Sequence, residues 1–79
     1  MKTVVLDARK MGEKESAHEY LKSIFDFPEY YGANLDALYD CLTEYPDLKI
    51  LILHTEEAGD YFNRLVKVME DACEVEFFS

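Results

Sequence analysis

The sequence predicts a small α/β fold in which three parallel strands pack against helices. A hydrophobic content of 49% and an aromatic content of 14% are enough for a folded core in 79 residues, which we expect to form one domain (1–79). The predicted elements follow the order strand, helix, helix, strand, helix, strand. Because helices separate the strands, parallel pairing through right-handed crossovers is expected.

The first strand and the first helix are indicated by local signals. Residues 3–8 are rich in β-branched residues and predict a strand. Ser16 is expected to cap the following helix, with Glu19 completing a capping box. The apolar residues of this helix follow helical spacing: Ala17, Tyr20, Leu21, Ile24 and Phe27. Pro28 disfavours helix at the preceding residue and ends the element, and Gly32 permits backbone angles or a close approach that a Cβ would block.

A second helix is expected to begin after Asn34, a favourable N-cap residue. Its core face consists of Leu35, Leu38, Cys41 and Leu42. Asp36 and Asp40 are four residues apart on another face, where like charges repel. The helix dipole favours Asp36 in the first turn but favours Asp40 much less. Since stability does not select for Asp40, its presence indicates a binding partner.

The predicted strand at residues 48–54 is the most apolar segment of the chain. Its alternate side chains are apolar on both faces, Ile50 and Ile52 on one and Leu51 and Leu53 on the other. Both faces therefore need cover, and we expect this strand at the centre of the sheet. If helices cover one face only, the other face is expected to allow a weak dimer of an otherwise monomeric protein.

The last helix and the last strand complete the predicted fold. Either Thr55 or Asp60 caps the helix, and Gly59 leaves its start open. The apolar stripe of this helix consists of Ala58, Phe62, Leu65, Met69 and Ala72. Residues 75–78 are expected to form the closing strand.

The charge of the chain points to a basic protein partner. With 17 acidic and 8 basic residues, the net charge of −9 repels phosphate, so neither nucleic acid nor an anionic membrane is an expected partner. No Lys or Arg lies between Lys22 and Lys49, a stretch that holds Asp26, Glu29, Asp36, Asp40, Glu44 and Asp47. The same stretch contains Tyr30, Tyr31, Tyr39 and Tyr45. Tyrosine is enriched at interfaces, although at least one of Tyr30 and Tyr31 is expected to pack onto the core.

Neither export nor membrane insertion is predicted. The apolar part of the N-terminal segment is too short for a signal peptide, and the run from Ile50 to Leu53 is too short to span a bilayer. We therefore expect a cytoplasmic protein. Cys41 and Cys73 form no disulfide framework and lack a CxxC motif or a nearby His, so they are interpreted as reduced thiols without a metal.

Signals of catalysis are weak. The glycines stand isolated at 12, 32 and 59, so no phosphate-binding loop is present, and no cofactor is expected. His18 and His54 lack metal-ligand spacing, and a lone His54 after a strand is more often structural than catalytic. Asp36 and Asp40 can be imagined as an acid–base pair, but a convex helix face supplies no supporting groups. An enzyme is kept only as a minor alternative.

The segment from Pro28 to Thr43 resembles the barstar family of intracellular ribonuclease inhibitors. The match runs in register through Pro28-Glu29-Tyr30-Tyr31-Gly32, Asn34-Leu35-Asp36-Ala37-Leu38 and Asp40-Cys41-Leu42-Thr43. The resemblance implies a two-layer α/β fold with about three helices and a parallel three-stranded sheet in the order 1-2-3. It also implies that the second helix and the loop before it plug the active site of a basic, barnase-type ribonuclease.

The same resemblance implies roles for individual residues. The contact positions that it transfers are Tyr30, Asn34, Leu35, Asp36, Asp40 and Thr43. Asp40 is the implied main anchor, whose carboxylate stands in for an RNA phosphate among basic groups of the enzyme. Asp36 pairs with a second basic group, and Tyr30 packs against the catalytic His of the enzyme.

Several positions depart from the pattern of the best-known family member, and Tyr39 stands in place of a Trp. Glu44-Tyr45-Pro46 follows Thr43 directly, which shortens the helix exit, and Tyr45 either replaces another Trp or matches the Tyr before Pro. We include Tyr39, Glu44 and Tyr45 in the expected partner surface. Lys67 falls at a position that is acidic in that family member, and Glu70 or Asp71 can supply the acidic group instead. These changes favour a different cognate enzyme or a narrower footprint, and leave open an immunity or adaptor protein for another basic toxin or protein.

Overall fold

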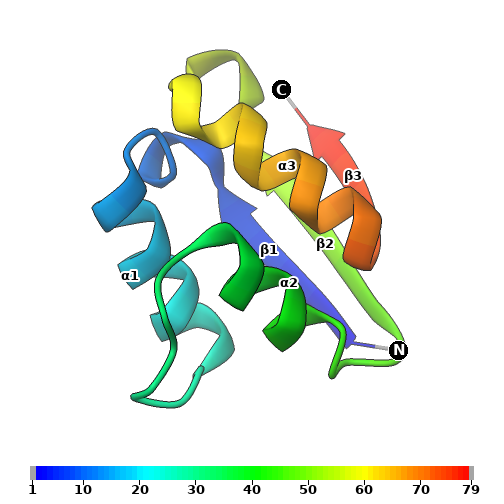
Figure 1. Cartoon of the computed structure of the whole chain (residues 1–79). Coiled ribbons are helices and arrows are strands. Elements are labelled where there is room, and N and C mark those ends of the chain that lie inside the picture. Colours follow the sequence, from blue (N-terminus) through cyan, green and yellow to red (C-terminus); the bar gives the residue numbers. More distant parts are fainter. Residues whose placement is uncertain (1, 79) are drawn as a thin grey trace.

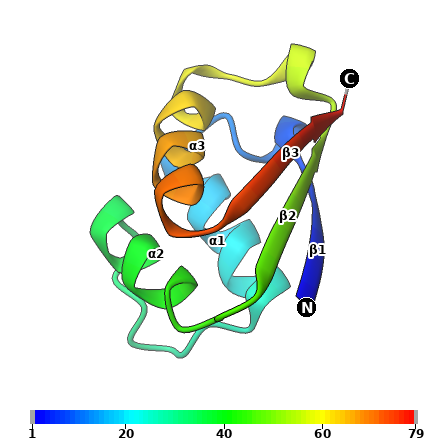
Figure 2. The ribbon, with the colours of Figure 1, turned by 90° about the vertical axis from the view of Figure 1, so that its right-hand side faces the viewer.

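The chain forms two layers, with the helices on one face of a parallel sheet (Figures 1 and 2). The computed structural model describes residues 2–78. The strands are β1 (Lys2–Asp7), β2 (Leu48–Leu53) and β3 (Glu74–Phe78), and the helices are α1 (Lys14–Phe25), α2 (Leu35–Leu42) and α3 (Asp60–Ala72). Short 3₁₀ turns, η1 (Ala8–Lys10) and η2 (Thr55–Glu57), follow β1 and β2. The sheet order β1-β2-β3 confirms the predicted fold class and the central place of β2.

The two faces of the sheet differ sharply in their cover. Ile50 and Ile52 of β2 face the helices and are fully buried. Leu53 faces the other way and remains 36% exposed, next to Phe78 of β3 and on the same face as Val5 of β1, which pairs with Leu51. Figure 2 shows why, since all the helices lie on the same side of the strands. The sequence correctly predicts the apolar character of both faces of β2, but helices cover only one of them.

The strand ends differ from the predicted ends by one residue. Ala8 leaves β1 because the chain turns into η1, where the Met11 N–H donates to the Ala8 carbonyl at 3.1 Å. His54 leaves β2 because its φ of 59° turns the backbone out of the sheet. Glu74 joins β3 because it pairs with Lys49 in the register of the sheet.

The start of α1 is an incorrect prediction. Helix α1 begins at Lys14 with Glu13 as N-cap, so Ser16 lies within the first turn and does not cap the helix. The earlier start and the end of α1 at Phe25 also change its apolar face. Phe25 is buried whereas Ile24 is 44% exposed. Asp26 adopts a left-handed conformation that ends the helix, so Phe27, which is also buried, reaches the core from outside α1.

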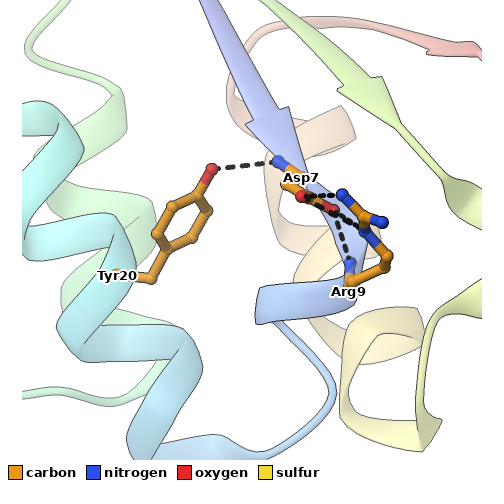
Figure 3. Close-up of polar contacts among 3 residues, drawn as sticks. All are labelled: Asp7, Arg9 and Tyr20. Carbon is orange, nitrogen blue, oxygen red and sulfur yellow. Dashed lines mark hydrogen bonds and ion pairs between the residues drawn. The ribbon is translucent and has the colours of Figure 1, made fainter.

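Tyr20 of α1 fastens the end of β1 to the helical layer (Figure 3). Its hydroxyl oxygen accepts a hydrogen bond from the Asp7 N–H at 3.0 Å. The Asp7 carboxylate accepts from the backbone and the guanidinium of Arg9, and these bonds hold the pKa of the carboxyl at about 2. Strand, turn and helix are thereby joined at one end of the sheet.

Two glycines bring the segment after η1 and the start of α3 into close contact. Gly59 is the N-cap of α3, so neither Thr55 nor Asp60 takes this position. A Cβ on Gly59 would lie 2.8 Å from the Gly12 Cα. Gly32 has no positive φ; the left-handed residue of that loop is Ala33, with a φ of 51°. A Cβ on Gly32 would instead lie 3.1 Å from the Asn34 side-chain amide.

None of the helices within residues 2–78 is long and apolar enough to cross a membrane.

The Gly12–Gly59 contact predicts a measurable asymmetry between two substitutions. Gly59→Ala places a methyl group 2.8 Å from backbone, and we expect it to lower the free energy of unfolding by about 1–3 kcal/mol. Gly12→Ala meets backbone only at 3.4 Å and serves as the matched control with a smaller effect. Urea titration of both variants measures the difference; equal stabilities would contradict the packing argument.

Candidate protein-binding surface

Helix α2 is fixed at its first turn by Asn34, as predicted. The Asn34 side-chain oxygen accepts a hydrogen bond from the Ala37 N–H at 2.8 Å, and its amide donates to the Gly32 carbonyl at 3.3 Å. Leu38 and Leu42 anchor the helix in the core, while Leu35 is half-buried. Both polar atoms of the Asn34 side chain are therefore engaged in holding the loop and helix together.

The outward face of α2 presents carboxylates that form no ion pair within residues 2–78. Asp36, Tyr39, Asp40 and Thr43 are exposed and follow helical spacing along this face. Neither aspartate side chain makes an ion pair or a hydrogen bond with the part of the chain that the structure describes. The Thr43 hydroxyl donates to the Asp40 carbonyl at 2.9 Å, which leaves the Asp40 carboxylate itself available.

The loop before α2 uses its two neighbouring tyrosines differently. Tyr30 is 88% exposed, whereas Tyr31 is half-buried and packs its ring 4.8 Å from that of Phe27. Phe27 in turn stacks on Phe25 at 5.2 Å. This aromatic series fixes the loop to the end of α1 and confirms that one of the two tyrosines packs onto the core.

A buried imidazole joins this loop to two helices. His18 of α1 is 2% exposed, with Nδ1 at 2.6 Å from the Tyr31 hydroxyl and Nε2 at 2.7 Å from the Tyr61 hydroxyl of α3. A neutral imidazole has one donor and one acceptor nitrogen, so one hydroxyl donates to the ring and the other accepts from it. No local sequence pattern links His18 with these tyrosines, which are 13 and 43 residues away.

The surroundings of His18 keep this group of side chains uncharged. Burial lowers the pKa of His18, and the positive charge of Lys14 lowers it further. Burial likewise raises the pKa of Tyr31 well above its usual range, and it raises the pKa of Tyr61. Neutral hydrogen bonds of 2.6 and 2.7 Å therefore hold the loop at ordinary pH.

Tyr45 and Glu44 lie where the chain leaves α2. Glu44 is exposed, but Tyr45 is half-buried, and its hydroxyl donates to the Phe25 carbonyl at 3.1 Å. The Tyr45 ring lies 5.9 Å from that of Phe25 and 4.8 Å below the Lys2 ammonium. Much of Tyr45 is thus occupied with packing the α2 exit against α1 and β1.

The fold brings two distant bases close to the acidic surface. A groove of about 350 Å³ is lined by Lys14 of α1, by Asn34, Leu35 and Asp36 at the start of α2, and by Tyr61 and Arg64 of α3. The sequence window without bases between Lys22 and Lys49 did not reveal these cations, because their proximity arises only from tertiary packing. Asp36 therefore lies at a boundary between charges of both signs, unlike the wholly acidic surface that the sequence suggested.

Neither a metal site nor a redox pair is formed within residues 2–78. This part of the chain holds no group of three or more His, Cys, Asp or Glu residues suited to a metal ion. Cys41 and Cys73 are free thiols, and burial raises the pKa of both, which disfavours the reactive thiolate.

The geometry defines a small α/β domain, in which an anchored loop and a helix present tyrosines and carboxylates that form no ion pair within residues 2–78. A family model described as "Barstar (barnase inhibitor)" matches residues 1–76. The Bacillus subtilis (strain 168) protein named "Putative ribonuclease inhibitor YrdF" is 40% identical over 80 aligned residues, covering 94% of this chain and 88% of that protein. The chain therefore belongs to the Barstar family. The membership confirms the resemblance drawn from Pro28 to Thr43 and assigns the chain to a family of inhibitors, not of enzymes.

The buried state of His18 predicts a specific pH dependence of stability. Its pKa is lower in the folded than in the unfolded chain, so as pH falls below about 6.5 the unfolded state binds a proton that the folded state does not. This contribution to the free energy of unfolding is present above pH 6.5 and decreases as pH falls toward the folded pKa.

His18→Gln removes the titrating group and is expected to be less stable at pH 7.5, with a difference from the unmodified protein that narrows between pH 6.5 and pH 5.5. Urea unfolding of both proteins at several pH values measures the difference. Comparison with the variant cancels most of the contribution of the carboxylates, which both proteins share. A difference that stays constant with pH would contradict a lowered pKa.

Proposed function

We propose that the chain inhibits a basic, barnase-type ribonuclease by covering its active site with the loop before α2 and the outward face of α2. The proposal depends mainly on one observation: Asp36 and Asp40 are exposed and lack ion-pair partners within residues 2–78. Membership in a family described by barnase inhibition supports it, as does the name of the B. subtilis relative. The proposed contact surface consists of Tyr30, Asn34, Leu35, Asp36, Tyr39, Asp40, Thr43, Glu44 and Tyr45.

In the proposed complex, Asp40 occupies the place of an RNA phosphate. A ribonuclease active site offers Arg, Lys and His groups to phosphate oxygens, and a carboxylate accepts the same charge-assisted hydrogen bonds. Asp36 binds a second basic group one helical turn away. Tyr30 is 88% exposed and can stack on a catalytic His with little loss of its own packing. The inhibitor blocks substrate access by occupancy and carries out no chemistry.

The overall charge of the chain supports rapid capture of such an enzyme. A net charge of −9 attracts a basic partner over a distance comparable to the Debye length. Association is then expected to slow as salt is added, whereas contacts formed by buried charges mainly control dissociation. An inhibitor of this kind protects its host where cellular RNA is present, so the proposed function operates in the cytoplasm.

A different basic partner is the second candidate function. Two features of the surface around α2 depart from the pattern of the best-known family member. Lys67 of α3 is exposed, and the chain turns sharply directly after Thr43. An immunity or adaptor protein for another basic toxin would use the same carboxylates. Recovery of a non-nuclease at stoichiometric yield in an unbiased pull-down would favour this reading.

Asp40→Ala tests the proposed anchor. Titration of a barnase-type ribonuclease is expected to show stoichiometric inhibition by the unmodified protein and a loss of affinity of about 30-fold or more in the variant, the size typical of an interface hot spot. Thermal unfolding should change little, because the Asp40 carboxylate makes no ion pair or hydrogen bond in the described chain.

Asp47→Ala is the matched control for total charge. Asp47 is exposed in the turn before β2, outside the proposed surface, and its loss changes the net charge by the same amount. The control should alter the association rate slightly and the dissociation rate not at all. Equal affinities of both variants at low and moderate salt would exclude Asp40 as the anchor.

The bare face of the sheet generates a separate expectation about assembly. We propose a monomer that forms a weak dimer through Val5, Leu53 and Phe78, which are 51%, 36% and 45% exposed. Light scattering at high concentration is expected to detect association in the unmodified protein and none in Leu53→Lys. Ile24→Lys, which adds the same charge on α1 at a residue 44% exposed, is the control. A strictly monomeric unmodified protein would contradict the proposal.

A further inference from the structure

The groove beside Asp36 adds a basic element to the acidic binding surface. Half of its lining, namely Asn34, Leu35 and Asp36, belongs to the proposed contact surface, so the groove is continuous with it. The other half brings Lys14 from the start of α1 and Arg64 from α3. A partner that covers the start of α2 therefore also covers these two cations.

The charges of the two groove cations are not neutralised by ion pairs within residues 2–78. Neither Lys14 nor Arg64 makes an ion pair or a hydrogen bond through its side chain with another described residue, although Asp36 lines the same groove. Lys49, by contrast, lies 2.8 Å from Glu76 and 3.9 Å from Glu74 across the sheet. In a chain with 17 acidic and 8 basic residues, ion pairs for these bases would be easy to form, so their unpaired state leaves both charges available to a partner.

The charge of a suitable ligand follows from the composition of the groove. An arginine guanidinium recognises a carboxylate with two parallel hydrogen bonds, and a lysine adds a point charge. Asp36 on the same groove would repel a highly charged phosphate group but tolerates a single carboxylate held between two cations. Lys67 follows Arg64 by three residues and extends the positive charge along the same side of α3.

We propose that the partner enzyme places an acidic side chain in this groove, against Lys14 and Arg64, next to the basic groups that meet Asp36 and Asp40. This inference rests on the proposed function and narrows it, because it selects a ribonuclease with a carboxylate at the rim of its basic active site. A ribonuclease with a uniformly basic rim would be repelled by Arg64 and bind more weakly. The groove thus gives different affinities for basic enzymes that would bind Asp40 alone with similar affinity.

The sign of a charge-removal effect tests the proposal. Arg64→Gln and Lys14→Gln are titrated against a barnase-type ribonuclease that the unmodified protein inhibits, with affinity measured by calorimetry. Each substitution is expected to weaken binding by at least about threefold. Lys22→Gln removes the same charge from the last turn of α1, outside the groove, and is expected to leave affinity unchanged or to raise it slightly.

The outcomes separate this inference from the function on which it rests. If Arg64→Gln and Lys14→Gln bind as tightly as the unmodified protein or more tightly, the enzyme presents no acidic group there and the inference is wrong, while inhibition stands. If the folded unmodified protein inhibits no barnase-type ribonuclease, the proposed function fails and the inference falls with it. Circular dichroism of each variant shows whether the fold is retained.

Discussion

The loop of the proposed binding surface depends on one buried histidine. His18 uses both ring nitrogens to connect the loop before α2, through Tyr31, with α3, through Tyr61, at 2.6 and 2.7 Å. The other contacts that hold this loop are local ones: the aromatic contacts of Phe27, the Asn34 cap and the Tyr31 N–H bond to the Pro28 carbonyl. Because burial keeps the imidazole neutral, the connection adds no charge to a surface whose charge is its main property.

The packing of the helical layer also explains how a short chain can hold the proposed interface rigid. The two-layer fold leaves one face of the sheet bare and concentrates its buried side chains between the sheet and the helices. Helix α2 packs against α3 and contributes Leu38 and Leu42 to that core. The side chains on its outward face are therefore not needed for core packing. Because a rigid helix already holds their backbone, these side chains lose little conformational freedom on binding.

Local signals in the sequence predicted the elements and part of the site, and non-local contacts account for what was missed. Asn34 capped α2 as expected, since its hydrogen bond spans only three residues. Ser16 failed as a cap because α1 starts earlier, at Lys14 with Glu13 as N-cap. His18 contacts Tyr61, and Arg64 lies in the groove beside the start of α2, only because the fold brings these distant segments together. A buried His with two hydroxyl partners leaves no spacing pattern by which a single sequence reveals it.

The isolated α2 surface is electrostatically unfavourable, and this supports the view that it evolved for a partner. Asp36 and Asp40 repel each other at helical spacing, at a cost of about 0.2–0.5 kcal/mol, and the last turn of α2 contains no basic residue to offset Asp40 at the negative end of the helix dipole. Asp36 shares its groove with Lys14 and Arg64, whereas Asp40 is not part of that groove. Asp40 is thus the less compensated of the two carboxylates, and it gains most when an external cation arrives. The same imbalance gives the proposed surface a direction, with an uncompensated carboxylate at Asp40 and positive charge beside Asp36, so the proposed partner is expected to dock in one orientation.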